Sequence, residues 1–319
     1  MVRATIVGAT SWGITLGEVL ARRGVATFIW ARSEAEALRF NGEASNPEFL
    51  SATASAAGAF DGTNLVVWAV PSQALRSNAV RLRGFLKPGM LLVSASKGLE
   101  MDSGKRMSEV LADVVPVALR NQICALSGPN LSSEIRRSLP AATVVAPASA
   151  AAGAAAGMLG SPGFRIQVTG DIIGVELCGA FKNVIAVGAG MMDGLGLGDN
   201  AKAAFIALGW GEVVKLGVAL GAERETFYGL AGLGDLVATS ASPLSRNHQL
   251  GFELGRGKTL LESRTALPHM SLEGVATAAA ARLLAKQSAV EIPIMSVVAE
   301  ALFDNVPPRQ AFASFWNRI

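Results

Sequence analysis

Histidine and cysteine are scarce in this chain of 319 residues, which contains only two of each. Cys124 and Cys178 lie far apart in apolar segments and form no Cys-x-x-Cys pair, so we interpret both as core thiols. His248 and His269 are the only imidazoles, which argues against a zinc site and against a histidine-rich catalytic centre. The sequence therefore predicts no metal.

Charge is also sparse, because only 17% of the residues are charged and the net charge is +3. No clustered basic stripe is present, which argues against nucleic-acid binding and favours a few cations placed for a small anionic ligand. Half of the residues are apolar, and a chain of this length is typical of two domains, each with its own core.

No signal peptide is expected, since a strand pattern begins at Thr5, and we expect a cytoplasmic protein. The uncharged stretch Leu139–Phe164 has the length of a membrane span. It contains Pro140, Pro147 and Pro162 and is rich in alanine, so a strand followed by a helix explains it better and no membrane span is predicted.

Short apolar runs alternate with helical patterns in the first half of the chain, which predicts an α/β domain with a mostly parallel, Rossmann-type sheet. Past Asp171 only helical patterns follow, so we predict a dinucleotide-binding domain at 1–171 and an all-helical substrate domain at 172–319. The expected strands are Ala4–Val7, Thr27–Trp30, Leu65–Val70, Met90–Val93, Ile123–Leu126, Thr143–Ala146 and Phe164–Val168. The expected helices are Ile172–Met191, Asn200–Leu220, 223–229, 245–256, 273–287 and 293–303. The stretch Asn41–Asp61 is expected to be partly irregular.

A glycine-rich turn, Gly8-Ala9-Thr10-Ser11-Trp12-Gly13, joins the first strand to a helical pattern. Such a turn aims the N–H groups of a helix N-terminus at a pyrophosphate. Thr10 replaces the middle glycine of the usual Gly-x-Gly-x-x-Gly pattern, so the motif gains its meaning from its place between strand and helix. An ordinary strand–helix turn is the alternative.

The end of the second expected strand, Trp30-Ala31-Arg32-Ser33, has no carboxylate of the kind that binds both ribose hydroxyls of NAD. Arg32 is instead suited to a 2′-phosphate, unless it is an exposed solubilising residue. We therefore expect either NADP or NAD as cofactor, with NADPH preferred.

Polar residues that follow two further strands, and others in the helical half of the chain, suit a catalytic site. Lys97 follows one strand and Ser127-Gly128-Pro129-Asn130 the next, where ligands of open α/β sheets bind. Lys182 has apolar neighbours on both sides and is either a snorkelling edge residue or a desolvated amine whose lowered pKa suits a general base. Farther on, Gly229-Leu230-Ala231-Gly232-Leu233-Gly234-Asp235-Leu236 precedes Ser245-Arg246-Asn247. Asp235 can orient an amine there, and Arg246 with Asn247 can hold a phosphate.

With these motifs the sequence resembles the NAD(P)-dependent glycerol-3-phosphate dehydrogenases from Ile6 to about Ile294. The most specific segments are Lys182–Ala204 and the Gly229–Leu236 turn followed by Ser245-Arg246-Asn247. The resemblance implies a homodimer that interconverts sn-glycerol 3-phosphate and dihydroxyacetone phosphate and supplies phospholipid synthesis, with Lys182 as proton acceptor. It assigns to the cofactor Ser11, Trp12, Arg32, Lys97, Ser132, Arg246 and Glu273. It assigns to the phosphorylated substrate Lys97, Gly128, Asn130, Lys182, Asp235, Ser245, Arg246 and Asn247. Departures from the family's usual residues are Thr10, Ser33, Asn130, Ser132 and Ser271.

Three other functions agree less well with these residues. A dehydrogenase of 3-hydroxy acids gives no reason for the Gly-rich turn and Ser-Arg-Asn to occur together. A non-catalytic dinucleotide sensor does not require Lys97, Lys182 and Asp235. A P-loop at Gly257-Lys258-Thr259 lacks the preceding glycine, because position 252 is Phe252, and no strand leads into it.

Overall fold

The computed structural model describes residues 2–43, 46–240, 245–266 and 273–316. Two compact units emerge. The first comprises Met1–Ser96 and Met107–Ile172, and the second comprises Lys97–Arg106 and Ile173–Ile319. The first unit ends at Ile172, next to the expected boundary at residue 171. The segment Lys97–Arg106 belongs to the second unit, which the sequence did not predict. Its charged side chains find partners there, as in the 2.8 Å pair of Arg106 with the buried Glu176.

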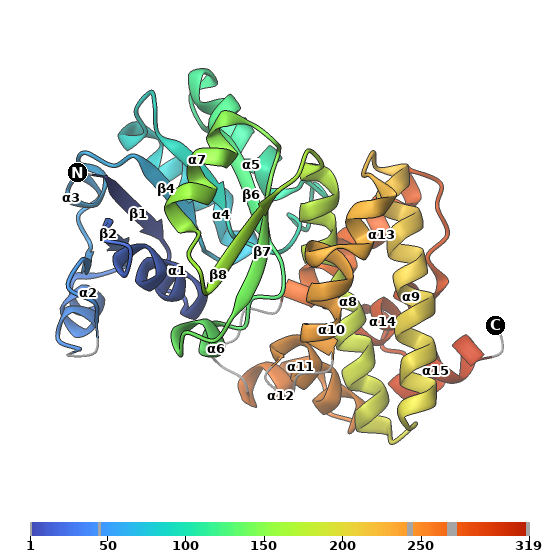
Figure 1. Ribbon diagram of the computed structural model, residues 1–319. Coiled ribbons are helices and arrows are strands. Elements are labelled where there is room, and N and C mark those ends of the chain that lie inside the picture. The colour runs from blue at the N-terminus through green and yellow to red at the C-terminus, as the bar shows by residue number, and fades with distance from the viewer. Residues whose placement is uncertain (1, 44–45, 241–244, 267–272, 317–319) are drawn as a thin grey trace. The chain divides into compact units, whose positions relative to one another are not determined.

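The first unit is built on one eight-stranded sheet with the order β3-β2-β1-β4-β5-β6-β7-β8 (Figure 1). Neighbouring strands are parallel except β6 and β7, so the prediction of a mostly parallel sheet is confirmed. The strands are β1 Arg3–Val7, β2 Ala26–Trp30, β3 Leu50–Thr53, β4 Leu65–Trp68, β5 Leu91–Ser94, β6 Ile123–Ser127, β7 Ala141–Ala146 and β8 Phe164–Val168.

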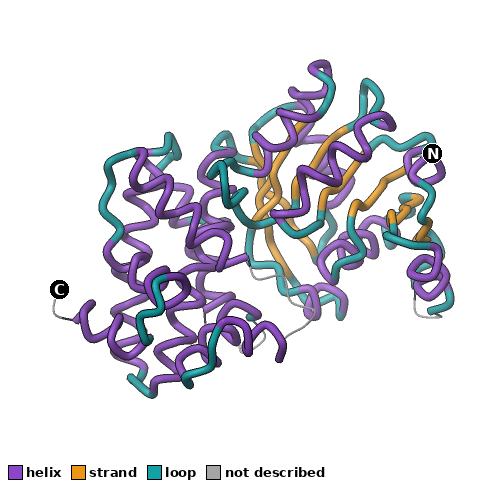
Figure 2. Tube along the Cα trace, turned by 180° about the vertical axis from the view of Figure 1, so that it is seen from behind, coloured by secondary structure: helices purple, strands orange, loops and turns teal. Residues whose placement is uncertain are grey.

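Helices cover both faces of this sheet, and strand β4 shows why (Figure 2). Its Leu65 and Val67 enter one core and its Val66 and Trp68 enter the other, since successive side chains of a strand point to opposite faces. The helices of this unit are α1 Ser11–Ala21, α2 Glu34–Asn41, α3 Ala56–Phe60, α4 Ser72–Leu82, α5 Met107–Val114, α6 Ser132–Arg136 and α7 Ala150–Leu159, with 3-10 helices η1 Arg83–Phe85 and η2 Val117–Gln122.

Strand β3 was not expected, because Leu50-Ser-Ala-Thr has no apolar run and lies at an edge of the sheet. Tertiary bonds hold it in place. The Asn41 amide donates to the carbonyl of Ala52 at 2.9 Å and accepts from its N–H at 2.7 Å. All seven strands that were expected are present, with small shifts of their ends. The stretch Leu139–Phe164 forms β7 and α7, as expected.

From Ile173 onward, the regular elements of the described part of the second unit are all helices. Its elements are α8 Ile172–Leu195, α9 Asp199–Ala219, α10 Asp235–Ser240, α11 Arg246–Gly255, α12 Leu260–Ala266, α13 Glu273–Gln287, α14 Pro293–Phe303 and α15 Pro308–Trp316, with the 3-10 helix η3 Arg224–Tyr228 and the π-helical turn η4 Leu230–Gly234. Helix α8 is long and apolar enough to cross a membrane, yet 89% of its apolar window is buried within the protein. It is therefore the core helix of this unit.

Candidate active site

The β1–α1 turn explains how threonine occupies the position of the middle glycine. Thr10 has an ordinary extended backbone, with φ −79°, so a side chain there causes no strain. Its hydroxyl accepts from the N–H of Gly13 at 3.0 Å and donates to the carbonyl of Ala69 at 2.8 Å. Gly8 and Gly13 cannot be replaced so easily: Gly8 has φ +114°, and a Cβ on Gly13 would lie 2.1 Å from the Gly8 carbonyl oxygen. Thr10 therefore caps α1 and ties the turn to the end of β4.

The residues of this turn fit a dinucleotide. The turn stands at the carboxyl ends of β1 and β4, where the strand order reverses direction and where open α/β sheets bind their ligands. The first N–H groups of α1, at Ser11 and Trp12, face the open end of the helix, as an anionic pyrophosphate requires. The indole Nε1 of Trp12 is buried and makes no hydrogen bond with the protein, so a ligand acceptor would satisfy it.

Arg32 lies beyond the end of β2, as predicted, but it has a partner that the sequence analysis missed. Its guanidinium forms an ion pair of 2.8 Å with Glu36, one turn along α2. The sequence shows no carboxylate at the strand end itself for the two ribose hydroxyls, but the structure places the carboxylate of Glu36 beside this strand end, because the residue four positions later folds back to the Arg32 backbone. The signal in the sequence was Ser33 followed three residues later by Glu36, a pattern typical of a helix N-terminus at which the acidic side chain reaches back to the backbone.

Gly128, Asn130 and Ser132 lie together in the first unit, in and after the loop that leaves β6. Gly128 has φ +154°, and a Cβ on it would lie 2.9 Å from the Thr143 Cα. The Asn130 amide donates to the Thr143 hydroxyl at 3.0 Å, and that hydroxyl donates to the Ser127 carbonyl at 2.9 Å. The Asn130 Oδ1 is buried without a protein partner. Asparagine thus orders this loop and keeps one acceptor available.

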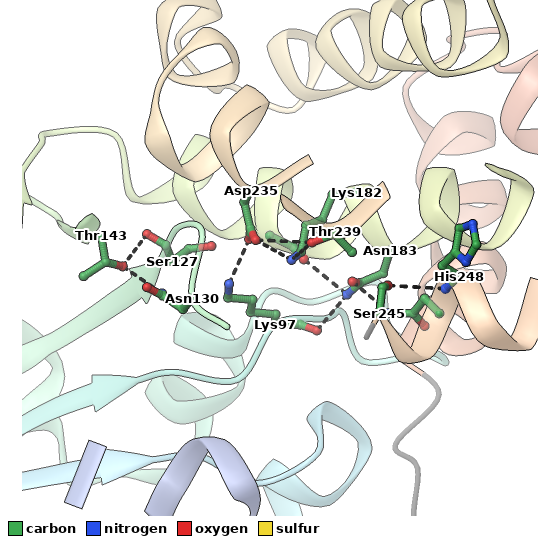
Figure 3. Close-up of polar contacts among 12 residues, drawn as sticks. Lys97, Ser127, Asn130, Thr143, Lys182, Asn183, Asp235, Thr239, Ser245 and His248 are labelled. Carbon is green, nitrogen blue, oxygen red and sulfur yellow. Dashed lines mark hydrogen bonds and ion pairs between the residues drawn. The ribbon is translucent and has the colours of Figure 1, made fainter. Parts of the chain in front are cut away.

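A chain of buried ionic contacts brings together the three charged residues singled out in the second unit (Figure 3). One carboxylate oxygen of Asp235 lies 2.5 Å from the Lys182 Nζ and the other lies 2.8 Å from the Lys97 Nζ. Lys182 also donates to the Thr239 hydroxyl at 2.7 Å. Thr239 was missed by the sequence analysis, although it follows Asp235 by one helical turn and so lies on the same face of α10.

The glycine-rich turn places Asp235 in this cluster. Gly232 lies in η4 against the backbone of η3, where a Cβ would approach the Phe227 carbonyl oxygen to 2.2 Å. A larger residue would push the turn away from η3. Asp235 then begins α10, whose N-terminal dipole favours a carboxylate. The glycines of this motif therefore allow close packing of the turn, and the packing positions the carboxylate of Asp235.

Burial sets the protonation of Lys182. Desolvation lowers the pKa of its amine to about 8, the attraction of Asp235 opposes that shift, and the nearby Lys97 adds to it. Its side chain is 7% exposed and that of Asp235 only 2%. With both amines protonated the cluster carries one net positive charge in a place shielded from water, and such a charge favours an anionic ligand.

Ser245, Arg246 and Asn247 start α11, and the structure gives them different surroundings. The Ser245 hydroxyl accepts from the N–H of His248 at 3.3 Å and caps the helix. The Asn247 amide donates to Asn183 Oδ1 at 2.9 Å and accepts from the N–H of Gly274 at 3.0 Å, which joins α11 to α8 and α13. Arg246, between them, is exposed. Ser245 and Asn247 thus fix the first turn of α11, on which Arg246 is exposed.

Glycines allow α11 to pack directly on the backbone of α8. A Cβ on Gly251 would lie 1.9 Å from the Val187 carbonyl oxygen, and one on Gly190 would lie 2.0 Å from that of His248. The His248 ring bonds Asp193 of α8 at 2.8 Å beside this crossing. The contacts fix the start of α11 relative to the turn of α8 that carries Lys182.

The remaining predicted positions are placed as follows. Glu273 is the first residue of α13 and is half-buried, while Ser271 lies outside the described residues. Cys124 and Cys178 are both buried, as expected of core thiols. Within the described ranges no group of three or more His, Cys, Asp or Glu residues is arranged to hold a metal ion.

Comparison with known proteins agrees with this geometry. The family models described as NAD-dependent glycerol-3-phosphate dehydrogenase N-terminus and C-terminus match residues 3–152 and 171–313. A glycerol-3-phosphate dehydrogenase [NAD(P)+] of Dehalococcoides mccartyi is 44% identical over 98% of this chain and 89% of its own length. One from Parafrankia sp. is 44% identical over 100% of this chain and 98% of its own. The crystal structure of glycerol-3-phosphate dehydrogenase from Coxiella burnetii superposes with a TM-score of 0.92 at 32% identity, covering 99% of each chain.

Proposed function

The chain belongs to the NAD-dependent glycerol-3-phosphate dehydrogenase family, and we propose on that premise how its own residues carry the reaction. It is an oxidoreductase that interconverts sn-glycerol 3-phosphate and dihydroxyacetone phosphate with NAD or NADP. When bound, the nicotinamide would supply the hydride acceptor for oxidation and the hydride donor for reduction. The observation that carries the assignment is the buried Lys97–Asp235–Lys182 cluster, which provides a proton-transfer group in a chain nearly without histidine.

Lys182 is the general base in the oxidation of glycerol 3-phosphate. The carbinol C–H bond breaks as the hydride leaves, the carbon–oxygen bond becomes a carbonyl, and the hydroxyl proton passes to the Lys182 Nζ. In the reverse direction the ammonium polarises the carbonyl and returns the proton. Two of its three hydrogens are directed at Asp235 and Thr239, and we assign the third to the substrate oxygen. A pKa of about 8 lets the amine exchange this proton near neutral pH.

Arg246 is the phosphate-binding residue. It stands at the N-terminus of α11, where the exposed guanidinium and the helix dipole both favour an anion. Lys97 contributes a second cation, and Ser245 and Asn247 hold the helix start. The family membership assigns Gly128 and Asn130, in the loop after β6, to the substrate as well. Binding energy from the phosphate, which does not react, helps to orient the carbinol carbon.

Ser11 and Trp12 on the β1–α1 turn would hold the pyrophosphate of the dinucleotide, and Arg32 would meet its adenosine ribose. The family membership assigns Ser132, Lys97, Arg246 and Glu273 to the cofactor as well, and NADPH is preferred over NADH. The protein acts in the cytoplasm as a homodimer and supplies glycerol 3-phosphate for phospholipid synthesis. The family membership supports these statements.

The decisive experiment follows the absorbance of NADPH and of NADH with dihydroxyacetone phosphate as substrate. The wild-type protein should oxidise both nucleotides, and only in the presence of the phosphorylated ketone. A Lys182→Ala protein purified in the same way controls for contaminating dehydrogenases. Wild-type protein that is folded but oxidises neither nucleotide would refute the proposed reaction.

A further inference from the structure

Glu36 holds a carboxylate beside the end of β2, although it belongs to helix α2. Its Oε2 accepts from the backbone N–H of Arg32 at 2.8 Å. The Ser33 hydroxyl accepts from the N–H of Glu36 at 3.2 Å and so caps the helix. These two bonds resemble a capping box and fix the first turn of the helix and the direction of its acidic side chain. The Glu36 side chain is only 14% exposed, so its carboxylate is held in one place.

The same carboxylate engages the guanidinium of Arg32. Nη2 lies 2.8 Å from Oε1, and Nε lies 3.3 Å from each oxygen. The hydrogen bond from Arg32 is the largest cause of a lowered pKa at Glu36, so the group is ionised at neutral pH. The Arg32 side chain is 88% exposed. This pair is neutral, whereas Arg32 alone would present a full positive charge.

We propose that Glu36 is a specificity-determining residue for the nucleotide, and this inference rests on the proposed dinucleotide site. A carboxylate at this end of the sheet accepts hydrogen bonds from the two ribose hydroxyls of NADH. The same carboxylate repels a 2′-phosphate and competes with it for Arg32. Glu36 therefore favours NADH, Arg32 favours NADPH, and their ion pair keeps the preference between the two cofactors narrow.

Replacing Glu36 by glutamine tests this balance without removing the helix cap, since glutamine also accepts from a backbone N–H. Glu36→Gln should lower the Kd for NADPH, because it frees Arg32 and removes the repulsion. It should raise the Kd for NADH, because a neutral amide is a weaker partner for the hydroxyls. Together the two changes should raise the ratio of the Kd for NADH to that for NADPH by about tenfold or more.

Direct binding is measured by calorimetry on the full-length protein, with NADPH and NADH and with 2′,5′-ADP and 5′-AMP, which lack the nicotinamide. Glu34→Gln is the matched control, because it removes the same charge from an exposed position in the same turn of α2. It should change each ratio by less than about twofold, as expected for a solvent-screened charge. In an Arg32→Ala background, the gain of Glu36→Gln in NADPH affinity should shrink, since there is no guanidinium to release.

Equal effects of Glu36→Gln and Glu34→Gln on the ratios, or a shift of Glu36→Gln toward NADH, would overturn the proposal. Thermal unfolding confirms that each variant is folded, and Glu36→Asp provides a second variant whose shorter side chain keeps the charge but withdraws it from Arg32. These readouts need no turnover. A protein that binds the nucleotides as expected but does not act on dihydroxyacetone phosphate would refute the proposed reaction and leave the role of Glu36 intact.

Discussion

The Nζ of Lys182 lies 2.5 Å from a carboxylate oxygen of Asp235 in a place that is almost closed to water. The contact holds the amine in a single position and opposes the effect of burial on its pKa. Since Lys182 lies on α8 and Asp235 on α10, the ion pair forms only when these two helices pack against each other.

Lys182→Ala should lower kcat by about 10²–10⁴, the range expected when acid–base catalysis is lost. The buried Asp235 keeps Lys97 as a partner in this variant, so the protein should fold. Lys215→Met, which removes an exposed lysine of α9, is the control and should retain wild-type kcat. Steady-state kinetics with circular dichroism check the result, and a folded Lys182→Ala protein with normal kcat would exclude the general-base role.

The pKa of about 8 for Lys182 predicts opposite pH profiles for the two directions. Oxidation needs the neutral amine, so its kcat/KM should rise through about pH 8. Reduction needs the ammonium, so its kcat/KM should fall over the same range. In Asp235→Asn the attraction that raises the pKa is lost, and both midpoints should move to lower pH.

Asp304→Asn removes a carboxylate that pairs with Arg282 instead, and both midpoints should stay in place. The profiles are measured with saturating nucleotide at constant ionic strength. A midpoint that does not move in Asp235→Asn would show that another group titrates.

Arg246→Ala should weaken catalysis with dihydroxyacetone phosphate much more than with unphosphorylated dihydroxyacetone. A hydrogen bond to a charged group contributes about 1.5–3 kcal/mol, which corresponds to roughly ten- to hundredfold in kcat/KM. Arg256→Ala, at the other end of α11, removes the same charge and should affect both substrates little. Equal losses on both substrates in Arg246→Ala would mean that this arginine is structural.

Gly251→Ala should destabilise the protein by about 1–3 kcal/mol, the usual effect of overpacking. The added Cβ would approach the Val187 carbonyl oxygen to 1.9 Å and force α11 away from α8. Gly211→Ala in α9 makes no such contact, because nothing lies within 4 Å of its Cβ, and it should stabilise the helix by up to about 1 kcal/mol. Urea unfolding of both variants measures the difference, and a neutral Gly251→Ala would contradict the close crossing.

The sequence by itself determined the elements whose signals are local. Alternating apolar strands and helical patterns predicted the parallel sheet, and the Gly8–Gly13 turn predicted its ligand-binding end, because side-chain periodicity and backbone freedom belong to the chain segment itself. Because histidine is scarce, Lys182 was the candidate for the general base. The motifs that resemble a known family predicted the reaction.

Only the tertiary structure decided which of these residues act together. Strand β3 escaped prediction because it has no apolar run, and its pairing with β2 and its hydrogen bonds with Asn41 hold it in the sheet. Asp235 lies far from Lys97 and Lys182 in sequence, and the packing of η4 on η3 brings its carboxylate to both amines. Glu36 is four residues from Arg32, yet its hydrogen bond to the Arg32 backbone, and not the spacing, shows that a carboxylate stands at the strand end. Charged side chains pair only within a few ångströms of each other, and the fold determines which side chains come that close.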